Sequence, residues 1–191
     1  MRTAVALATL LVLLAASTAA ADPPLVEKEP APPARSTGLR IAELANVAAS
    51  GLQAGWLLGG AIVSGPTRRG LDYPDYVEYQ QDFLDNSNPV APLLMPTTTV
   101  ANIVPLWLMR KERKGARFWL TAAGLACNLG VIAAAAAFNV PANSDIESWS
   151  ASQPPPDDWT EVRDRWETGQ SLRTVFAIGA FGFNAAGALV F

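Results

Sequence analysis

The polar residues best placed to do chemistry lie near the C-terminal end of the chain. Arg173 lies at the start of an apolar stretch. It can extend toward lipid headgroups, or act as a fixed cation that faces a ligand anion or a buried acid. Asn139 and Asn143 flank Pro141 in what we expect to be a tight turn. Their amides would either cap a helix end or donate hydrogen bonds to a ligand. These residues alone do not define a catalytic site.

An amphipathic helix is predicted between three consecutive prolines and the last apolar stretch. Asp158, with Glu161 three residues later, has the spacing of a capping box at the start of that helix. Its tryptophans either anchor the protein at the membrane surface or line a cavity for an aromatic ligand. Helical spacing puts the following residues on one face: Trp159, Val162, Trp166 and Gly169 or Gln170.

The composition excludes several classes of function. The 191 residues include no His and one Cys, which excludes disulfide frameworks, His-ligated metal or haem, and His-based triads. A net charge of −3 provides no basic face for nucleic acid. Half of the residues are apolar and only 16% are charged, well below the roughly 25% of soluble domains. The chain is therefore expected to be a membrane protein that binds no nucleic acid.

The N-terminal region has the pattern of a secretory signal. A short positive region at Arg2, an apolar core from Ala4 to Ala16 and small residues at Ala19 to Ala21 predict a signal peptide over residues 1–21. The alternative is an uncleaved signal anchor. Residues 22–38 are rich in proline and predict a disordered linker. We expect a multi-pass integral membrane protein of the secretory pathway or plasma membrane.

Four apolar stretches predict an all-α, four-helix transmembrane bundle over residues 39–191. Gly51, Gly55 and Gly59 share one face of the first span, where another helix could approach closely. We expect that helix to be the packing centre, and its glycine face to be available for a homo-oligomer. Glu43 is either a buried acid or an interface residue. The predicted spans are Ile41–Ser64, Val90–Met109, Phe118–Phe138 and Leu172–Phe191.

The charges of the three connecting loops predict an orientation. Loops 66–89 and 139–171 have net charges of −3 and −5, whereas the short loop 110–117 has a net charge of +4. The basic loop should therefore be cytoplasmic. A cleaved signal, however, would leave the N-terminus of the first span outside and with it the basic loop. The two rules conflict, and the sequence does not decide between them.

Several of these segments together resemble one family. They are the run Asn139 to Asn143, then Ile146, Trp149 and Trp159, and the run Trp166 to Thr174. In this order they resemble the C-terminal signature of the anthrone oxygenase-like membrane proteins, an N-x-P-x-N turn followed by a segment ending in Arg-Thr. The family's first span and long loop are similar to Gly51 to Pro66, Tyr76 to Phe83, and Asn88 with Pro89, so that the resemblance covers Leu39 to Phe191.

The resemblance implies a four-helix membrane bundle that oxidises an anthrone with dioxygen and uses no metal, flavin or other cofactor. An anthrone has an acidic methylene, and its anion can pass an electron to dioxygen. The protein need only remove the proton, hold the anion near a cation and exclude water. The resemblance suggests Arg173 as the cation, Asn139 or Asn143 as oxyanion donors and Trp166 as a stacking wall. The base is unassigned, with Asp164, Glu167 and Glu43 as candidates.

This chain departs from the family pattern at Gln170, where relatives often carry His or Asn. A glutamine amide cannot act as a base, so this residue only donates hydrogen bonds or the chain lacks such activity. We assign Arg173, Gln170 and Asn143 to catalysis, and Trp166, Asn139 and Trp159 to substrate binding. The expected partners are membrane lipids, an aromatic small molecule and dioxygen. The alternative function is a non-catalytic membrane scaffold or a subunit that binds a lipid or small ligand.

Overall fold

The computed structural model describes residues 35–87 and 90–190, and this part of the chain is helical with no β-strand. The predicted signal peptide (1–21) and most of the predicted linker lie outside the described residues. Within the described part of the chain, four helical rods are long and apolar enough to cross a membrane: Thr37–Gly70, Ala91–Leu108, Ala116–Glu147 and Trp159–Leu189. The elements are α2 (Thr37–Gly59), η1 (Gly60–Ser64), α3 (Gly65–Gly70), α4 (Tyr73–Ser87), α5 (Ala91–Leu108), α6 (Ala116–Ala134), η2 (Ala135–Asn139), α7 (Val140–Glu147) and α8 (Trp159–Leu189).

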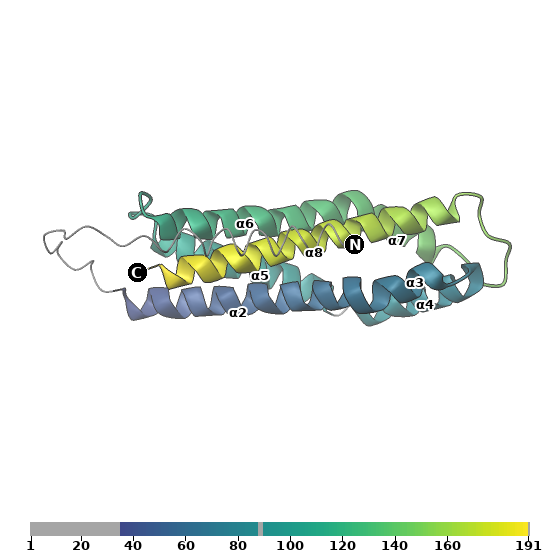
Figure 1. Cartoon of the computed structure of the whole chain (residues 1–191), viewed down its shortest axis with the longest axis horizontal. Helices are drawn as coiled ribbons and strands as arrows, with labels where there is room; N and C mark the ends of the chain where they lie inside the picture. The colour runs from purple at the N-terminus through teal and green to yellow at the C-terminus, as the bar shows by residue number, and fades with distance from the viewer. Residues whose placement is uncertain (1–34, 88–89, 191) are drawn as a thin grey trace, which may run out of the picture.

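The long helices form an up-and-down bundle, which confirms the predicted all-α membrane fold (Figure 1). α2 packs against α5 and α8, and α6 packs against the same two helices. α4, α7 and the first turns of α8 extend the bundle at one end into a small helical head (Figure 1). The short basic loop and the start of α2 lie together at the opposite end (Figure 1). The charge rule therefore places this end of the bundle in the cytoplasm, whereas a cleaved signal peptide would place it outside.

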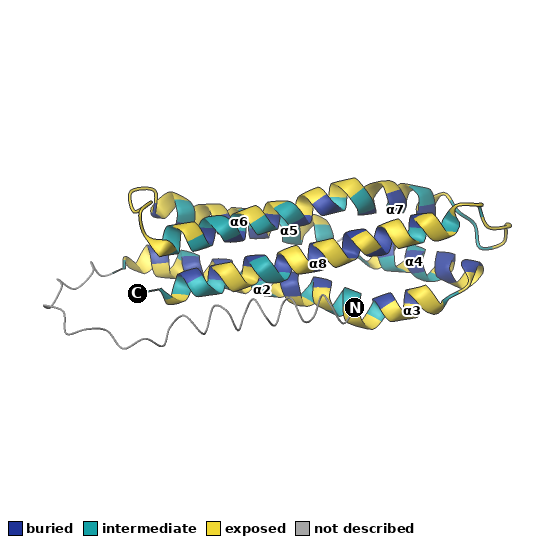
Figure 2. Cartoon of the chain, turned by 45° about the horizontal axis from the view of Figure 1, so that its top comes forward, coloured by how far each residue is buried: buried dark blue, intermediate teal, exposed yellow. Residues whose placement is uncertain are grey.

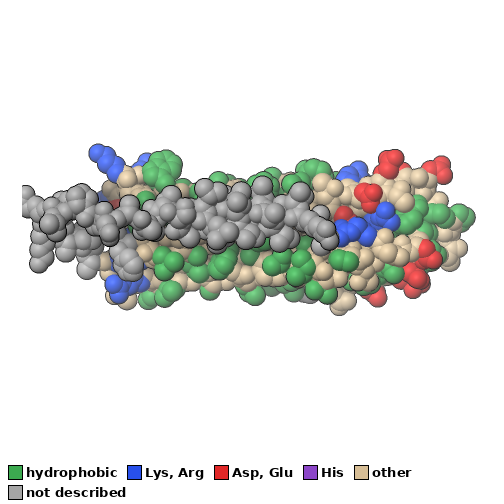
Figure 3. All heavy atoms as spheres, viewed as in Figure 1, with side chains coloured by type: hydrophobic (Ala, Val, Ile, Leu, Met, Phe, Trp, Pro, Cys, Tyr) green, Lys and Arg blue, Asp and Glu red, His purple; other side chains and the backbone are tan. Residues whose placement is uncertain are grey.

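Polar side chains gather inside the bundle, and apolar side chains cover its outside. Buried residues face inward along each helix (Figure 2), and charged side chains gather at the two ends (Figure 3). The interior polar groups include Ser50, Gln53, Thr98, Asn102, Asn128 and Asn184. This arrangement suits a membrane protein, because lipid offers polar groups no partner while neighbouring helices do. Asn184, for example, donates to the Oδ1 atom of Asn102 at 3.0 Å.

Two short π-helical segments continue the helices past Pro66 and Pro141, whereas the predicted spans ended before these prolines. η1 ends two residues before Pro66, and η2 ends two residues before Pro141. A proline ring clashes with the carbonyl four residues earlier, and a π turn widens the helix at that point. The expected tight turn from Asn139 to Asn143 is therefore wrong, because this segment is helical. The capping box is also wrong, since the Asp158 side chain makes no capping hydrogen bond.

The head is built mainly from segments that the sequence did not predict to be structured. The loop expected over residues 66–89 contains α3 and α4 instead. Two tyrosines of α4 pack against Trp159: the ring centroid of Tyr73 lies 5.6 Å from that of Trp159, and the ring centroid of Tyr76 lies 5.9 Å from it. Buried residues of the head form one cluster: Tyr76, Leu84, Ala142, Ile146, Val162 and Trp166. The head therefore has its own hydrophobic core.

The first span is not the packing centre that its glycines predicted. Gly51 packs on the Phe181 ring, but a side chain added at Gly55 or Gly59 would meet open space. The closest glycine contacts among the described residues lie elsewhere, at Gly124 and Gly130 of α6 and at Gly169 of α8. A Cβ atom at Gly169, for example, would come within 2.6 Å of the Cβ atom of Phe138. The interior face of α2 is instead formed by larger residues: Leu39, Glu43, Asn46, Ser50, Gln53, Ala54 and Leu57.

Candidate functional site

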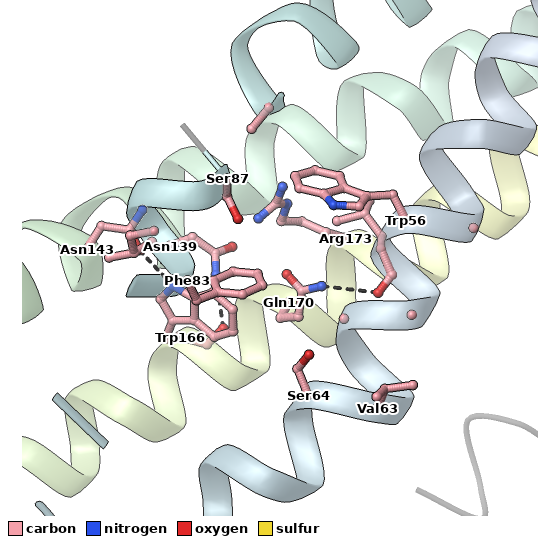
Figure 4. A pocket seen from close by; sticks show the side chains of 16 residues that line it. Trp56, Val63, Ser64, Phe83, Ser87, Asn139, Asn143, Trp166, Gln170 and Arg173 are labelled. Carbon is pink, nitrogen blue, oxygen red and sulfur yellow. Dashed lines mark hydrogen bonds between the residues drawn. The ribbon is translucent and has the colours of Figure 1, made fainter. Parts of the chain in front are cut away.

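A cavity of about 460 Å³ lies where the transmembrane bundle meets the head (Figure 4). Its walls come from α2 and η1, from the end of α4 and start of α5, and from η2, α7 and α8. The residues that line it are Gly55, Trp56, Leu57, Gly59, Gly60, Val63, Ser64, Phe83, Leu84, Ser87, Ala91, Asn139, Asn143, Trp166, Gln170 and Arg173. A cavity of this size is typical for a small organic ligand.

The structure brings together five of the six residues that the sequence assigned to a site. Three of them, Trp166, Gln170 and Arg173, follow one face of α8, because α8 is continuous through the predicted start of the fourth span. Asn139 and Asn143 reach the cavity from η2 and α7. Trp159 does not line the cavity and packs in the head against Tyr73 and Tyr76.

Arg173 is the one charged residue among the described lining residues of the cavity. Its side chain points into the cavity from α8 (Figure 4). The residue is only 8% exposed, yet its Nε atom has no hydrogen-bond partner and it joins no ion pair within the described part of the chain. A buried charge without a partner is unfavourable. The arrangement is therefore suited to an anion held in the cavity.

Trp166 forms an aromatic wall that is fixed from two sides. Its indole Nε1 donates to the Oδ1 atom of Asn143 at 2.7 Å, and the side-chain amide of Asn139 donates to its backbone oxygen at 3.0 Å. Phe83 meets the indole edge to face, with ring centroids 5.9 Å apart. The amide of Asn139 is thus engaged with α8, while its Oδ1 atom has no partner among the described residues. Both asparagines position Trp166.

Gln170 joins α8 to the π-helical region of the first rod. Its amide donates to the carbonyl oxygen of Leu57 at 3.2 Å, and the hydroxyl of Thr174 donates to the same oxygen at 3.2 Å. Leu57 precedes η1, where the widened helix leaves a carbonyl available to side chains. Gln170 therefore holds two walls of the cavity together.

A buried ion pair between Arg68 and Glu167 packs against the Trp166 ring. No pattern in the sequence predicted this pair. Arg68 is fully buried and donates to the Oε1 atom of Glu167 at 2.6 Å. Its guanidinium carbon lies 4.5 Å from the centre of the Trp166 ring and 5.3 Å from that of Phe83. Arg69 donates to the other carboxylate oxygen of Glu167 at 3.1 Å. Only a long-range contact reveals this pair, because its members are 99 residues apart.

None of the three candidate bases lines the cavity. Asp164 is exposed and pairs with Arg163, and Glu167 is engaged by Arg68 and Arg69. Glu43 lies at the basic end of the bundle, where it is buried and pairs with Arg35 and Arg117. Tyr76 is no substitute, because burial, assisted by the charge of Glu167, raises the pKa of its phenol. The phenol therefore stays protonated at neutral pH.

The glycines of the first rod have a different role from the one predicted. Gly55, Gly59 and Gly60 all line the cavity, and a Cβ atom at Gly60 would come within 3.0 Å of the Gln170 amide. Because these three positions carry no side chain, they leave room in the cavity that a larger residue would fill.

These features define a class of protein: a four-helix membrane bundle with an aromatic cavity at one end that holds one buried arginine. The family model for anthrone oxygenase matches residues 83–183, more than half of the chain. The chain belongs to the anthrone oxygenase family, as its C-terminal motifs indicated. The matched region includes five cavity-lining residues of the predicted site, whereas the whole first rod lies outside it. No curated protein and no solved structure matches the chain.

Proposed function

We propose that this protein is a membrane oxygenase that oxidises an anthrone-like polycyclic aromatic with dioxygen and no cofactor. The observation that carries the proposal is Arg173, a buried cation without a partner in an aromatic cavity. Membership of the anthrone oxygenase family supports it. An anthrone offers both features that the cavity accepts, since it has a planar body and an oxygen that becomes negative on deprotonation.

Arg173 would act on the acidity of the substrate. A guanidinium beside the anthrone oxygen stabilises the anion formed when the methylene loses a proton, and thereby lowers the pKa of the bound substrate. The described lining includes no carboxylate, so a water molecule inside the cavity would receive that proton. This assigns Arg173 the role of catalytic cation and leaves the described lining without a dedicated base.

The oxidation then balances without another reactant. The substrate anion passes an electron to dioxygen, and a carbon–oxygen bond forms at the methylene carbon to give a hydroperoxide. Loss of water from the hydroperoxide leaves a carbonyl group. The methylene carbon loses four electrons and dioxygen gains four, with one oxygen atom kept in the quinone and the other released as water. Trp166 and Phe83 would hold the ring system while these steps occur.

The test is turnover of an anthrone by the purified protein in lipid vesicles under oxygen. We expect quinone to form faster than in protein-free vesicles, with one dioxygen consumed per quinone and one oxygen atom of labelled dioxygen in the product. Arg173→Met should return the rate to near the spontaneous value. A rate no faster than that of protein-free vesicles across several anthrones would overturn the proposal.

A second function, a subunit that binds a ligand without turnover, is favoured by one observation. The described lining lacks a base, and the amides of Gln170 and Asn139 are engaged in holding helices together. In that case a hydroxylated anthraquinone would bind in an Arg173-dependent manner, while anthrone oxidation would proceed only at the spontaneous rate. The same vesicles serve for both measurements.

A further inference from the structure

The cavity has its opening at the side of the bundle, not at its end. Among the lining residues, Gly55 is exposed and Val63 is 68% exposed. Ser87 and Ala91 form the facing rim and are half-buried. α5 has only 18 residues, whereas the other three rods have 31 to 34. The cavity therefore lies where the short helix begins, between the first rod and the junction of α4 with α5.

The surroundings of this opening are apolar. Ile62 is 51% exposed, and Leu58, Val90 and Leu93 are also exposed near the rim. A helix of 18 residues is roughly 27 Å long, about the thickness of the hydrocarbon layer. Ala91, its first residue, thus marks the level of one membrane surface. The opening faces acyl chains just below the headgroups.

The one charged group in the described lining has the opposite character. Arg173 is almost fully buried, has no partner among the described residues, and reaches the cavity near Ser87 and Trp56 (Figure 4). A ligand that reaches Arg173 through an apolar opening must itself dissolve in lipid. It must also carry an oxygen that can become negative once it has left the lipid.

We infer that the ligand comes from the bilayer, through the side opening between η1 on one side and Ser87 at the end of α4 and Ala91 at the start of α5 on the other. It is a membrane-dissolved planar polyaromatic compound with one ionisable oxygen. The inference rests on the proposed function in one respect: it assumes that the same cavity binds the same class of ligand. The route is a property of the opening and does not require that the ligand be oxidised.

A photochemical experiment tests the route without any turnover. A hydroxyanthraquinone is attached by an alkyl linker to the acyl chain of a phospholipid, and in a second sample to water-soluble dextran. Near-ultraviolet light makes this group abstract hydrogen from neighbouring C–H bonds, and the labelled peptides are identified by mass spectrometry. We expect about tenfold more labelling of residues 55–64 from the lipid-borne probe, because the bilayer concentrates it beside the opening.

Two matched variants locate the opening. Val63→Trp should lower labelling by the lipid-borne probe about tenfold, because a bulky side chain blocks the rim. Leu44→Trp is the control, since Leu44 is 68% exposed on the same rod but lies eleven residues before its first cavity-lining residue, Gly55. Equal losses in both variants would overturn the inference.

The remaining outcomes also decide the question. Equal or stronger labelling by the dextran-borne probe shows that the cavity opens to water, and overturns the inference. Labelling by neither probe also overturns it, as expected if a second copy of the chain covers the glycine face. Labelling from lipid combined with no anthrone turnover would support the route while rejecting the proposed oxygenase.

Discussion

Arginines at both ends of the bundle are at least partly buried, but the two ends pair them differently. At the basic end, Glu43 pairs with Arg35 at 3.2 Å and with Arg117 at 3.7 Å. Arg35 also donates to the carbonyl oxygen of Ala188 at 2.7 Å and to that of Val190. Arg117 donates to the carbonyl oxygen of Val190 at 3.0 Å. These contacts tie the start of α2 to the end of α8.

At the cavity end one arginine is paired in the same way and another is not. Arg68 is fully buried and bound to Glu167, and the pair closes the head behind Trp166. Arg173 lies on the other side of that ring, in the cavity, and the described residues offer it no counter-charge. Burial alone therefore does not distinguish a structural arginine from a ligand-binding one.

The difference teaches where to expect a ligand. A buried ion pair offsets part of the desolvation of both groups, so its effect is to fix helices in place. A buried cation without a partner makes the protein less stable unless a ligand supplies the missing charge. Changes at the two ends should therefore have opposite consequences for stability and for function.

The largest effect on stability is expected from Glu43→Leu. The substitution leaves Arg35 and Arg117, which are half-buried at the basic end, without their carboxylate, which should cost about 2 kcal/mol of unfolding free energy. Unfolding in mixed detergent micelles measures the loss. Glu112→Leu, in the exposed basic loop, is the control and should change stability little. If the folded fraction of Glu43→Leu also loses turnover, Glu43 takes part in the reaction and the contrast between the ends is wrong.

Arg173→Met should separate function from stability. We expect anthrone turnover to fall on the order of 100-fold, because the substrate anion loses its charged partner. The unfolding free energy should stay the same or rise, since an unpaired buried charge has been removed. Both quantities are measured on the same purified sample. A marked loss of stability would mean that Arg173 is a structural residue like Arg68.

Arg173→Lys tests the geometry of the contact and should have a smaller effect. Lysine keeps the charge but lacks the planar, two-pronged guanidinium, so we expect about a tenfold loss in binding of a hydroxyanthraquinone. Arg113→Lys in the exposed basic loop is the matched control and should change nothing. Equal tolerance of both substitutions would identify Arg173 as a residue that only reaches toward the headgroups.

Asn143→Ala should have the smallest effect. It removes the acceptor of the Trp166 indole N–H, which should cost about 1 kcal/mol and weaken ligand binding a few-fold through a less fixed ring. Asn86→Ala is the control, because Asn86 is exposed and bonds only to a carbonyl of its own helix. Unchanged binding in Asn143→Ala would show that the ring does not need this support.

Much of the fold and part of the site could be predicted from the sequence. Trp166 and Gln170 were placed on one helical face by their spacing, and both line the cavity. The role of Glu43 was left open between a buried acid and an interface residue, and only its contacts show a buried, paired acid. Trp159 was predicted on the same helical face as Trp166, but it packs in the head because Tyr73 and Tyr76 of α4 cover it there. Periodicity predicts a face, and the neighbouring helix decides what that face meets.

The sequence by itself determined that the described part of the chain has four helices long and apolar enough to cross a membrane, and which ends carry charge. Apolar stretches of this length must be helical in lipid, since a helix satisfies its own backbone hydrogen bonds. Only the tertiary structure decided that the rods continue through Pro66 and Pro141, that Arg68 meets Glu167, and that Arg173 meets no partner. The physical reason is that the stability of a π turn or of a buried charge depends on the hydrogen-bond donors, acceptors and counter-charges that other helices supply. The carbonyl of Leu57, which accepts from Gln170 and Thr174 of α8, illustrates this dependence.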